Sequence, residues 1–199
     1  MNGCVRKNAN SIYYNSLVKL LDSVEVSNAC FLVTGASGLI GSCLIDLLML
    51  ANENGANNTI FALGRSRDKL VSRFPQYVNN PKFVMLEQNI CQPLDKSLCF
   101  DYILHGASNA DPISYARYPA ETMTTNFLGS YNVLEYSREH EKCKILIMST
   151  FEVYGNTGND EYIEADAGII DFNELRSCYP ESKRAVETLS QCYASEYNI

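Results

Sequence analysis

The feature that most constrains this chain is a glycine-rich turn, Thr34-Gly35-Ala36-Ser37-Gly38-Leu39-Ile40-Gly41, between an apolar run and a segment of helical periodicity. A strand, a tight glycine turn and a helix N-terminus together can hold a diphosphate. Gly35 allows a sharp turn, Gly38 a close approach of phosphate, and Gly41 close packing of the helix on the strand. A loop without a ligand is the alternative, which the flanking elements disfavour. We therefore expect a dinucleotide site with contacts from Gly35, Ser37, Gly38, Leu39, Ile40 and Gly41.

Apolar segments of strand length alternate with helical segments along the chain. The pattern predicts strands over 30–34, 59–63, 83–87, 101–105 and 144–149, and helices over 12–24, 39–51, 67–74, 120–138 and from Pro180 onward. This alternation is typical of an α/β fold in which a parallel, doubly wound sheet has helices on both faces. Ligands of such sheets bind at the carboxyl ends of the strands. That edge would carry Gly35, Gly64, Asn89, His105 and Ser149.

The composition fits one such domain. The chain has 199 residues, 46% of them hydrophobic. We expect residues 1–27 to form an N-terminal extension, disordered over 1–10 and with a short helix after it, and residues 28–199 to form the dinucleotide-binding domain. The net charge of −7 disfavours nucleic acid and anionic membranes as partners. No apolar run approaches the roughly 20 residues of a membrane span.

The cysteine pattern favours a cytoplasmic protein without a metal site. The eight cysteines include no C-x-x-C pair and several lie in apolar runs, as free thiols of a reducing compartment do. His105 and His140 lie far from any paired cysteines, so we expect no zinc. His105, at a strand end, is interpreted as structural rather than catalytic.

Tyr179 and Lys183 are spaced to lie on one face of a helix. A nearby ammonium would lower the pKa of the phenol from about 10 toward neutrality. Such a tyrosine can take the proton of a substrate hydroxyl while the carbon loses hydride. A surface tyrosine with a solvated lysine is the alternative, and the glycine turn is what favours the catalytic interpretation.

Several motifs occur in the order found in one family. They are the turn 34–41, His105-Gly106-Ala107-Ser108, Asn126, Ser149-Thr150-Phe151-Glu152-Val153-Tyr154-Gly155, and Tyr179-Pro180-Glu181-Ser182-Lys183. Over residues 28–199 the chain resembles the extended short-chain dehydrogenase/reductases, and within them the nucleotide-sugar epimerases, dehydratases and decarboxylases. The resemblance implies a Rossmann-like fold and a catalytic triad of Thr150, Tyr179 and Lys183. It implies that Thr150 hydrogen-bonds the sugar, that Lys183 also holds the nicotinamide ribose, and that Asn126 is a structural and proton-relay residue.

Two neighbouring residues, Phe151 and Glu152, narrow the choice among these reactions. The resemblance implies a small or neutral residue in place of Glu152 in simple 4-epimerases, and a glutamate in dehydratases and uronate decarboxylases. Dehydratases have an aspartic acid where Phe151 stands, and a phenyl ring cannot deliver a proton. Decarboxylases usually have serine there, so the preference for a decarboxylase over a 4,6-dehydratase is slight. Glu152 as an ordinary loop carboxylate is the alternative.

The residues expected around the adenosine of the cofactor are compatible with either NAD or NADP. A site that prefers NAD offers an acid after the second strand, but here Gly64-Arg65-Ser66-Arg67 precedes the first acid, Asp68. Arg65 could grip a 2′-phosphate or stack on adenine. Asn89 and Ile90 stand where the family usually has an aspartate and an apolar residue near the adenine, while Gly106 and Ala107 would let the cofactor lie against the sheet.

The resemblance also implies what lies beyond this stretch. Family members continue after the tyrosine–lysine helix into a small substrate domain and often form a homodimer through the helices over 120–138 and 180–197. We expect a chain truncated before that C-terminal domain, with little turnover from residues 1–199 alone. The expected function is transient oxidation of a nucleotide-sugar at C4, followed by decarboxylation, dehydration or epimerisation. An NADP-dependent carbonyl reductase and a non-catalytic dinucleotide-binding module are the alternatives.

Overall fold

The computed structural model describes residues 12–23 and 25–199. The predictions for residues 1–10 and for Val24 therefore lie outside the described residues. The chain forms two compact units, which we describe separately. The sheet unit comprises the chain up to residue 89 together with 95–106 and 142–146, and the helical unit comprises 90–94, 107–141 and 147–199.

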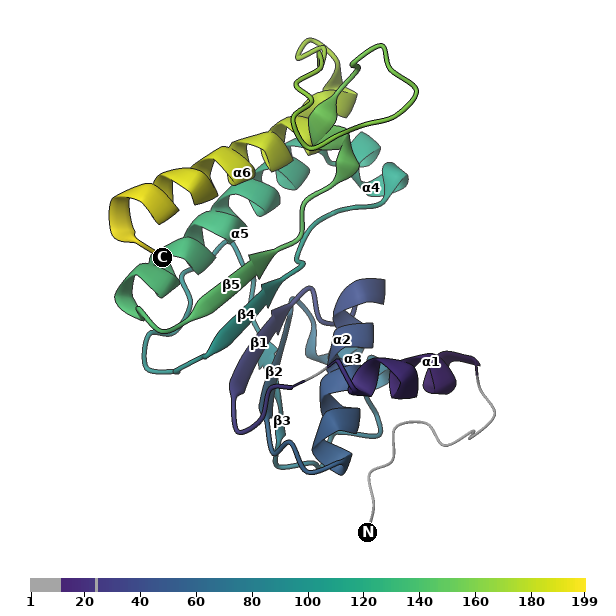
Figure 1. Ribbon diagram of the computed structural model, residues 1–199, viewed down its shortest axis with the longest axis vertical. Coiled ribbons are helices and arrows are strands. Elements are labelled where there is room, and N and C mark those ends of the chain that lie inside the picture. The colour runs from purple at the N-terminus through teal and green to yellow at the C-terminus, as the bar shows by residue number, and fades with distance from the viewer. Residues whose placement is uncertain (1–11, 24) are drawn as a thin grey trace. The chain divides into compact units, whose positions relative to one another are not determined.

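The five strands form one sheet in the order β3-β2-β1-β4-β5 (Figure 1). They are β1 (Cys30–Thr34), β2 (Thr59–Gly64), β3 (Phe83–Glu87), β4 (Tyr102–His105) and β5 (Lys144–Ile147). The pairs β1–β2, β1–β4 and β2–β3 are parallel, which confirms the predicted sheet. The order is that of the first five strands of a doubly wound dinucleotide-binding fold.

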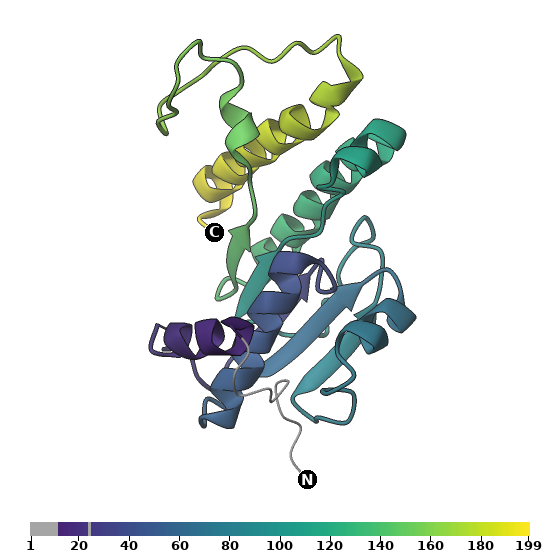
Figure 2. The ribbon, with the colours of Figure 1, turned by 90° about the vertical axis from the view of Figure 1, so that its right-hand side faces the viewer.

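Three helices belong to the sheet unit: α1 (Ile12–Leu21), α2 (Leu39–Glu53) and α3 (Arg67–Arg73). α2 packs on β1 and β2, and α3 packs on β2 and β3, so both cover the same face of the sheet (Figure 1). α1 lies across α2 (Figure 2) and buries only Leu17 among its own residues. The periodicity therefore predicted each of these helices to within three residues at its ends.

A buried carboxylate, which the periodicity did not reveal, ties these helices together. Asp46 on α2 accepts hydrogen bonds from the hydroxyls of Tyr13 at 2.7 Å and Tyr77 at 2.9 Å. The guanidinium of Arg73 lies 3.8 Å from the same carboxylate. A charge that is only 3% exposed needs such partners, so Asp46 fixes α1 and the end of α3 on α2.

The helical unit contains α4 (Pro112–Arg117), α5 (Pro119–Glu139) and α6 (Cys178–Tyr197), with two 3₁₀ turns, η1 (Phe151–Tyr154) and η2 (Leu175–Ser177). α5 and α6 pack along each other (Figure 1). α4 was not predicted, because its six residues are too short to show periodicity. The start of α4 is fixed by Asp111, whose side chain caps the helix and accepts a hydrogen bond from the N–H of Ser114 at 2.9 Å.

Two boundaries in other elements also differ from the prediction by two residues. β5 ends at Ile147 rather than at residue 149, and α6 begins at Cys178 rather than at Pro180. A proline is tolerated anywhere in the first turn, where its missing N–H has no intrahelical partner, so Pro180 does not mark the first helical residue. Among the helices of the described ranges, none combines the length and apolar character needed to span a membrane.

Candidate active site

The glycine turn has the geometry that the sequence predicts. Gly35 has a φ of +66°, a conformation that residues with side chains rarely adopt. A Cβ on Gly41 would lie 2.5 Å from the carbonyl oxygen of Gly35, and one on Gly38 would lie 3.2 Å from that oxygen. Of these two positions, Gly41 is therefore the one less able to carry a side chain.

The N-terminus of α2 is open to solvent. Gly38 caps the helix without a side-chain hydrogen bond, and the first turn of the helix contains no acid. Leu39 is 89% exposed and Ile40 is 56% exposed. The first N–H groups of α2 are thus available to an anion and lie at the positive end of the helix dipole. These residues fit a diphosphate group.

Hydrogen bonds join this turn to the strands on either side of it. The N–H of Ala36 donates to the carbonyl of Leu63 at 3.3 Å, and the N–H of Gly106 donates to that of Thr34 at 3.3 Å. The N–H of Gln88 donates to Gly64 at 3.0 Å on the next strand. The carboxyl ends of β1, β2, β3 and β4 therefore meet at one edge, as expected.

The other predicted residues of this edge differ in their surroundings. His105 is buried and its Nδ1 lies 2.8 Å from the hydroxyl of Thr34, which agrees with a structural role. Arg65, Asn89 and Gly106 are exposed, and Ala107 is half-buried. Ile90 is buried in the helical unit, where its carbonyl accepts a hydrogen bond from Asn132 at 2.8 Å.

Within the helical unit, Thr150, Tyr179 and Lys183 lie together. Tyr179 and Lys183 are buried on α6. The Nζ of Lys183 donates to the carbonyl of Met148 at 2.6 Å, on the segment that leads to Thr150. The Thr150 hydroxyl is hydrogen-bonded to the phenol of Tyr179 and accepts from the N–H of Glu152 at 3.3 Å. Burial lowers the pKa of Lys183 to about 8.

The expected effect of Lys183 on Tyr179 was wrong for the chain without cofactor. Burial raises the pKa of Tyr179 above its ordinary value, although the hydrogen bond to Thr150 opposes this. The ammonium of Lys183 donates its hydrogen bond to the backbone carbonyl of Met148 and not to the phenol.

Asn126 is connected to the backbone of Tyr179. Its Nδ2 donates to the hydroxyl of Ser182 at 2.9 Å, and that hydroxyl donates to the carbonyl of Tyr179 at 2.8 Å. Its Oδ1 is buried and has no hydrogen-bond partner among the residues that the structure describes. Asn126 therefore positions the helix that carries Tyr179 and keeps one buried acceptor available.

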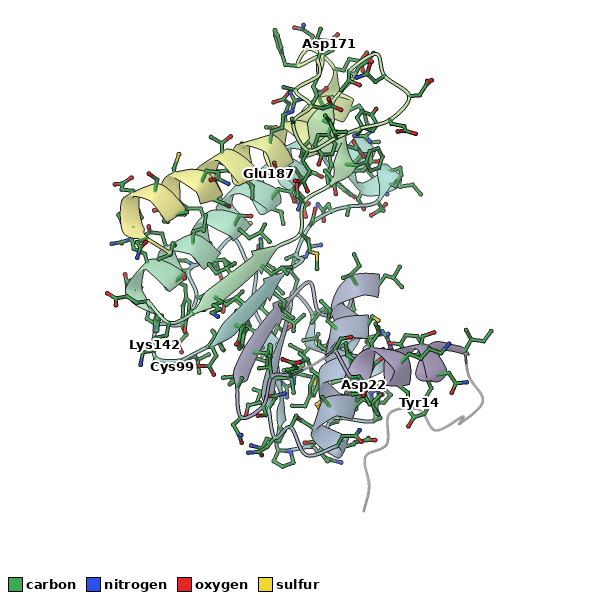
Figure 3. The ribbon with its side chains drawn as sticks, in the orientation of Figure 1. Tyr14, Asp22, Cys99, Lys142, Asp171 and Glu187 are labelled. Atoms are coloured by element: carbon green, nitrogen blue, oxygen red, sulfur yellow. The ribbon has the colours of Figure 1, made fainter. Side chains whose placement is uncertain are left out.

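Glu187 continues this cluster along α6. It accepts a hydrogen bond from the hydroxyl of Ser149, and its charge opposes the lowering of the pKa of Lys183 (Figure 3 labels Glu187). The sequence analysis did not include Glu187. Its spacing of one helical turn after Lys183 was the signal that could have found it.

Glu152 lies in η1 and pairs with Arg176, a residue that the sequence analysis also missed. The guanidinium Nη2 of Arg176 lies 2.8 Å from Oε2 of Glu152 and 2.9 Å from Oε1. The same guanidinium stands 4.2 Å from the ring centroid of Tyr115. That ring stacks on Tyr179 with 5.5 Å between centroids.

A hollow of about 390 Å³ opens beside this pair. Its lining includes Phe151, Glu152, Tyr162, Ile169 and Arg176. Phe151 is 69% exposed and its ring lies 6.5 Å from that of Tyr162. The hollow therefore combines aromatic rings with one acid and one base, which suits a sugar that carries an anionic group.

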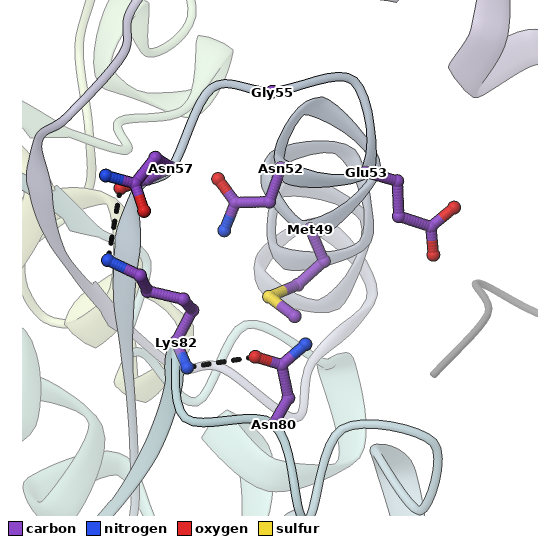
Figure 4. A pocket seen from close by; sticks show the side chains of 7 residues that line it. All are labelled: Met49, Asn52, Glu53, Gly55, Asn57, Asn80 and Lys82. Carbon is purple, nitrogen blue, oxygen red and sulfur yellow. Dashed lines mark hydrogen bonds between the residues drawn. The ribbon is translucent and has the colours of Figure 1, made fainter. Parts of the chain in front are cut away.

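Another hollow, of about 440 Å³, lies in the sheet unit between the end of α2 and the loops that precede β2 and β3 (Figure 4). Lys82 crosses it to the carbonyl of Asn57 at 3.5 Å. It lies at the amino ends of the strands, opposite to the edge where such sheets bind ligands. We therefore do not assign it to the active site.

Comparison with known proteins gives the family. The profile of the NAD dependent epimerase/dehydratase family matches residues 31–199. The chain belongs to this family. It is 34% identical over 167 residues to UDP-glucuronic acid decarboxylase 4 of Arabidopsis thaliana, covering 84% of this chain and 36% of that one. It is 35% identical over 176 residues to UDP-glucuronic acid decarboxylase 6 of the same plant, covering 87% and 48%.

Solved structures of epimerases share the fold. A UDP-N-acetylglucosamine 4-epimerase from Methanobrevibacter ruminantium M1 has a TM-score of 0.72 at 20% identity, covering 87% of this chain and 53% of that one. A UDP-glucose 4-epimerase from Thermotoga maritima has a TM-score of 0.63 at 25% identity, covering 85% and 52%. The chain thus spans about half of these structures and half or less of the curated decarboxylases. All the candidate site residues fall within the stretch that matches the epimerase/dehydratase family.

Proposed function

We propose that this chain is the cofactor-binding and acid–base part of a nucleotide-sugar enzyme, and that its reaction is decarboxylation of a UDP-hexuronate. The observation that carries the proposal is the cluster of Thr150, Tyr179 and Lys183 next to Glu152, in a chain similar to UDP-glucuronic acid decarboxylases. The substrate and the reaction are carried over from those relatives.

The glycine turn and the N-terminus of α2 would hold the diphosphate of NAD or NADP, with Gly106 and Ala107 beside the rest of the cofactor. When bound, the nicotinamide supplies a reversible hydride acceptor for C4 of the sugar. We assign Tyr179 as the base that takes the proton of the 4-hydroxyl, with Thr150 as a hydrogen-bond donor to the same oxygen. Lys183, still protonated at pH 7, would hold the nicotinamide ribose.

Decarboxylation needs little further help from the protein. Once C4 is a ketone, the uronate is a β-keto acid, so the bond between C5 and C6 breaks and carbon dioxide leaves. The electron pair forms an enolate on the C4 oxygen, and C5 then takes a proton. C4 finally takes back a hydride and its oxygen a proton from Tyr179, so the product is a UDP-pentose and the cofactor would be restored. We assign Glu152 to proton exchange at the ring carbon. Phe151 cannot protonate a departing 6-hydroxyl, which favours decarboxylation over 4,6-dehydration.

The test uses the natural gene product and UDP-glucuronate labelled with ¹³C at C6. We expect release of labelled carbon dioxide and a UDP-pentose, with no net change in added cofactor. The Tyr179→Phe variant should lower turnover at least 100-fold, since the phenol is the proposed base. Product without loss of label would identify an epimerase, and net oxidation of NADPH would identify a carbonyl reductase. Either result would overturn the proposal.

We also propose that the protein is a cytoplasmic homodimer. The support for dimerisation is one side of α5, where Met123, Phe127, Leu128 and Tyr131 are each about 40% exposed or more. A Phe127→Glu variant should shift the mass measured by light scattering from dimer to monomer, and an unchanged mass would contradict this interface.

The support for a cytoplasmic location comes from the cysteines. Those in the described parts of the chain are free thiols, as expected in a reducing compartment.

A further inference from the structure

We propose that Glu187 is a positioning residue for the acid–base cluster, which acts on Lys183 and Thr150 without touching the substrate. The inference rests on the proposed function, which assigns Lys183 and Thr150 to the reaction. It deepens that function by naming the residue that holds these two groups in place and keeps one of them charged. All the residues concerned belong to the helical unit.

One face of α6 is bonded to the segment that follows β5. Tyr179, Lys183 and Glu187 are four residues apart, so they lie in a row along the helix. Three successive residues of the segment each bond to a different member of this row. The bonds join Met148 to Lys183, Ser149 to Glu187, and Thr150 to Tyr179. The row therefore fixes the whole stretch that carries Thr150.

The bond of Glu187 is the central one of the three in the segment. The hydroxyl of Ser149 donates to Oε1 of Glu187 on α6 (Figure 3). A hydrogen bond to a carboxylate is about twice as strong as one between neutral groups. Since Ser149 lies between the acceptor of Lys183 and the hydroxyl that meets Tyr179, a fixed Ser149 restrains both of its neighbours in the chain.

Glu187 also acts on the charge of Lys183. The ammonium is 5% exposed and donates to a neutral carbonyl, which compensates its charge less well than an acid does. Burial lowers the pKa of Lys183 to about 8, and the charge of Glu187 opposes this lowering. In the part of the chain that the structure describes, Glu187 is the charged group that shifts this pKa. Without it, a larger share of the lysine would be neutral at pH 7.

The alternative is a surface pair that contributes only to the fold. Ser149 and Glu187 are both exposed, and exposed polar pairs contribute little to stability. Replacing either leaves no cavity, so the variants should fold. A pair with a role in the fold alone would leave the charge of Lys183 unchanged when an amide replaces the acid. This difference makes the proposal testable.

Titration of Lys183 in the chain, followed by NMR with ¹³C-labelled lysine, tests the effect on charge without requiring turnover. Lys183→Arg assigns the resonance. We expect a midpoint near pH 8 in the natural chain and a midpoint lower by about 0.5–1 in Glu187→Gln. Glu187→Asp should restore part of the difference. Glu196→Gln, which removes another exposed acid of α6, is the matched control and should leave the midpoint unchanged.

Turnover of UDP-glucuronate by the natural gene product tests the effect on position. Glu187→Gln should lower kcat about 10-fold and change KM less than about 3-fold, because Glu187 does not touch the substrate. Ser149→Ala should lower kcat as well. The double variant should lose less than the product of the two effects, since both changes break one bond. Thermal unfolding of each variant establishes that it is folded.

Three outcomes would overturn the inference. They are an unchanged midpoint of Lys183 in Glu187→Gln, an unchanged kcat, and a raised KM at unchanged kcat, which would make Glu187 a substrate contact. A natural gene product without turnover would overturn the proposed function instead. The titration would then still decide whether Glu187 maintains the charge of Lys183, so the two failures are distinguishable.

Discussion

The guanidinium of Arg176 lies 2.8 Å from the carboxylate of Glu152. It also covers the ring of Tyr115, which in turn stacks on Tyr179. One cation therefore contacts the candidate acid directly and the candidate base through an intervening ring. This arrangement links the two sides of the proposed proton chemistry within a single unit of the chain.

Replacement of Arg176 should move the pH profile of the enzyme. Arg176 lowers the pKa of Tyr179 and Glu152 raises it, although burial is the largest influence and keeps the pKa above its ordinary value. In Arg176→Ala the pKa of Tyr179 rises further, so the ascending limb of turnover, which requires the phenolate, shifts to higher pH. We expect turnover at pH 7 to fall on the order of 10-fold. Arg176→Lys should retain part of it, since the charge remains without the planar stacking.

Arg117 supplies the matched control for this measurement. Its guanidinium also stands over a tyrosine ring, that of Tyr118, at 5.3 Å, and no part of that pair belongs to the candidate site. Arg117→Ala should leave the pH profile of the natural gene product unchanged. Equal profiles for Arg176→Ala and Arg117→Ala would refute a role of Arg176 in tuning Tyr179.

The buried ammonium of Lys183 should lower the free energy of unfolding at neutral pH. Its pKa is about 8 in the folded chain, against 10.5 ordinarily, because the ammonium is buried. Between these two pH values the unfolded chain binds more protons, so stability increases as pH rises from about 8 to 10.5. Below pH 8 the cost of burying the charge is fully present and is on the order of 3 kcal/mol.

The Lys183→Met variant makes this cost measurable. At pH 7 it should be more stable than the natural chain by about 1–2 kcal/mol, after the lost hydrogen bond to Met148 is subtracted. The advantage should disappear by about pH 10.5. Urea unfolding at both pH values measures it, with Lys142→Met, at an exposed lysine labelled in Figure 3, as the control. A deficit of Lys183→Met that is the same at both pH values would contradict the prediction.

The glycines of the turn should differ in their tolerance of a methyl group. A Cβ on Gly41 would lie 2.5 Å from the carbonyl oxygen of Gly35, whereas one on Gly38 would lie 3.2 Å away. Gly41→Ala must displace the turn, so we expect it to lower the midpoint of thermal unfolding and to weaken dinucleotide binding more than 10-fold. Gly38→Ala, the matched control, should have the smaller effect on the midpoint. The reverse order would show that the turn is not held by this contact.

The sequence predicted the elements whose signal is local and periodic. The turn at Gly35, the strands around it and the spacing of Tyr179 and Lys183 follow from glycine placement and from repeats of two and of 3.6 residues. Asp46 and Arg176 could not be predicted, because the partners of each lie at least 24 residues away in the sequence. The direction of the pKa shift of Tyr179 was predicted wrongly for the same reason, since burial is its largest cause and depends on packing that no spacing reveals.

Arg184 should hold the irregular segment 155–176 against α6. Its Nε donates to the carbonyl of Val153 at 2.5 Å, and its Nη2 donates to that of Gly168 at 2.7 Å. In Arg184→Met both carbonyls lose their charged donor, which costs about 1–3 kcal/mol per unsatisfied group. The N–H of Ile169, bonded to Asn156 at 3.0 Å, should then exchange with deuterium at least 10-fold faster.

The matched control for Arg184 is Arg138→Met. Arg138 pairs with Glu135 on the exposed side of α5, and such surface pairs contribute about 0–1 kcal/mol. Exchange at Ile169 should be unchanged in this variant, because Arg138 has no bond to the segment. If both variants leave Ile169 equally protected, the antiparallel bridge between Asn156 and Ile169 holds the segment by itself. A selective loss of protection in Arg184→Met would instead mean that α6, which carries Tyr179 and Lys183, also orders the segment that lines the hollow beside Glu152.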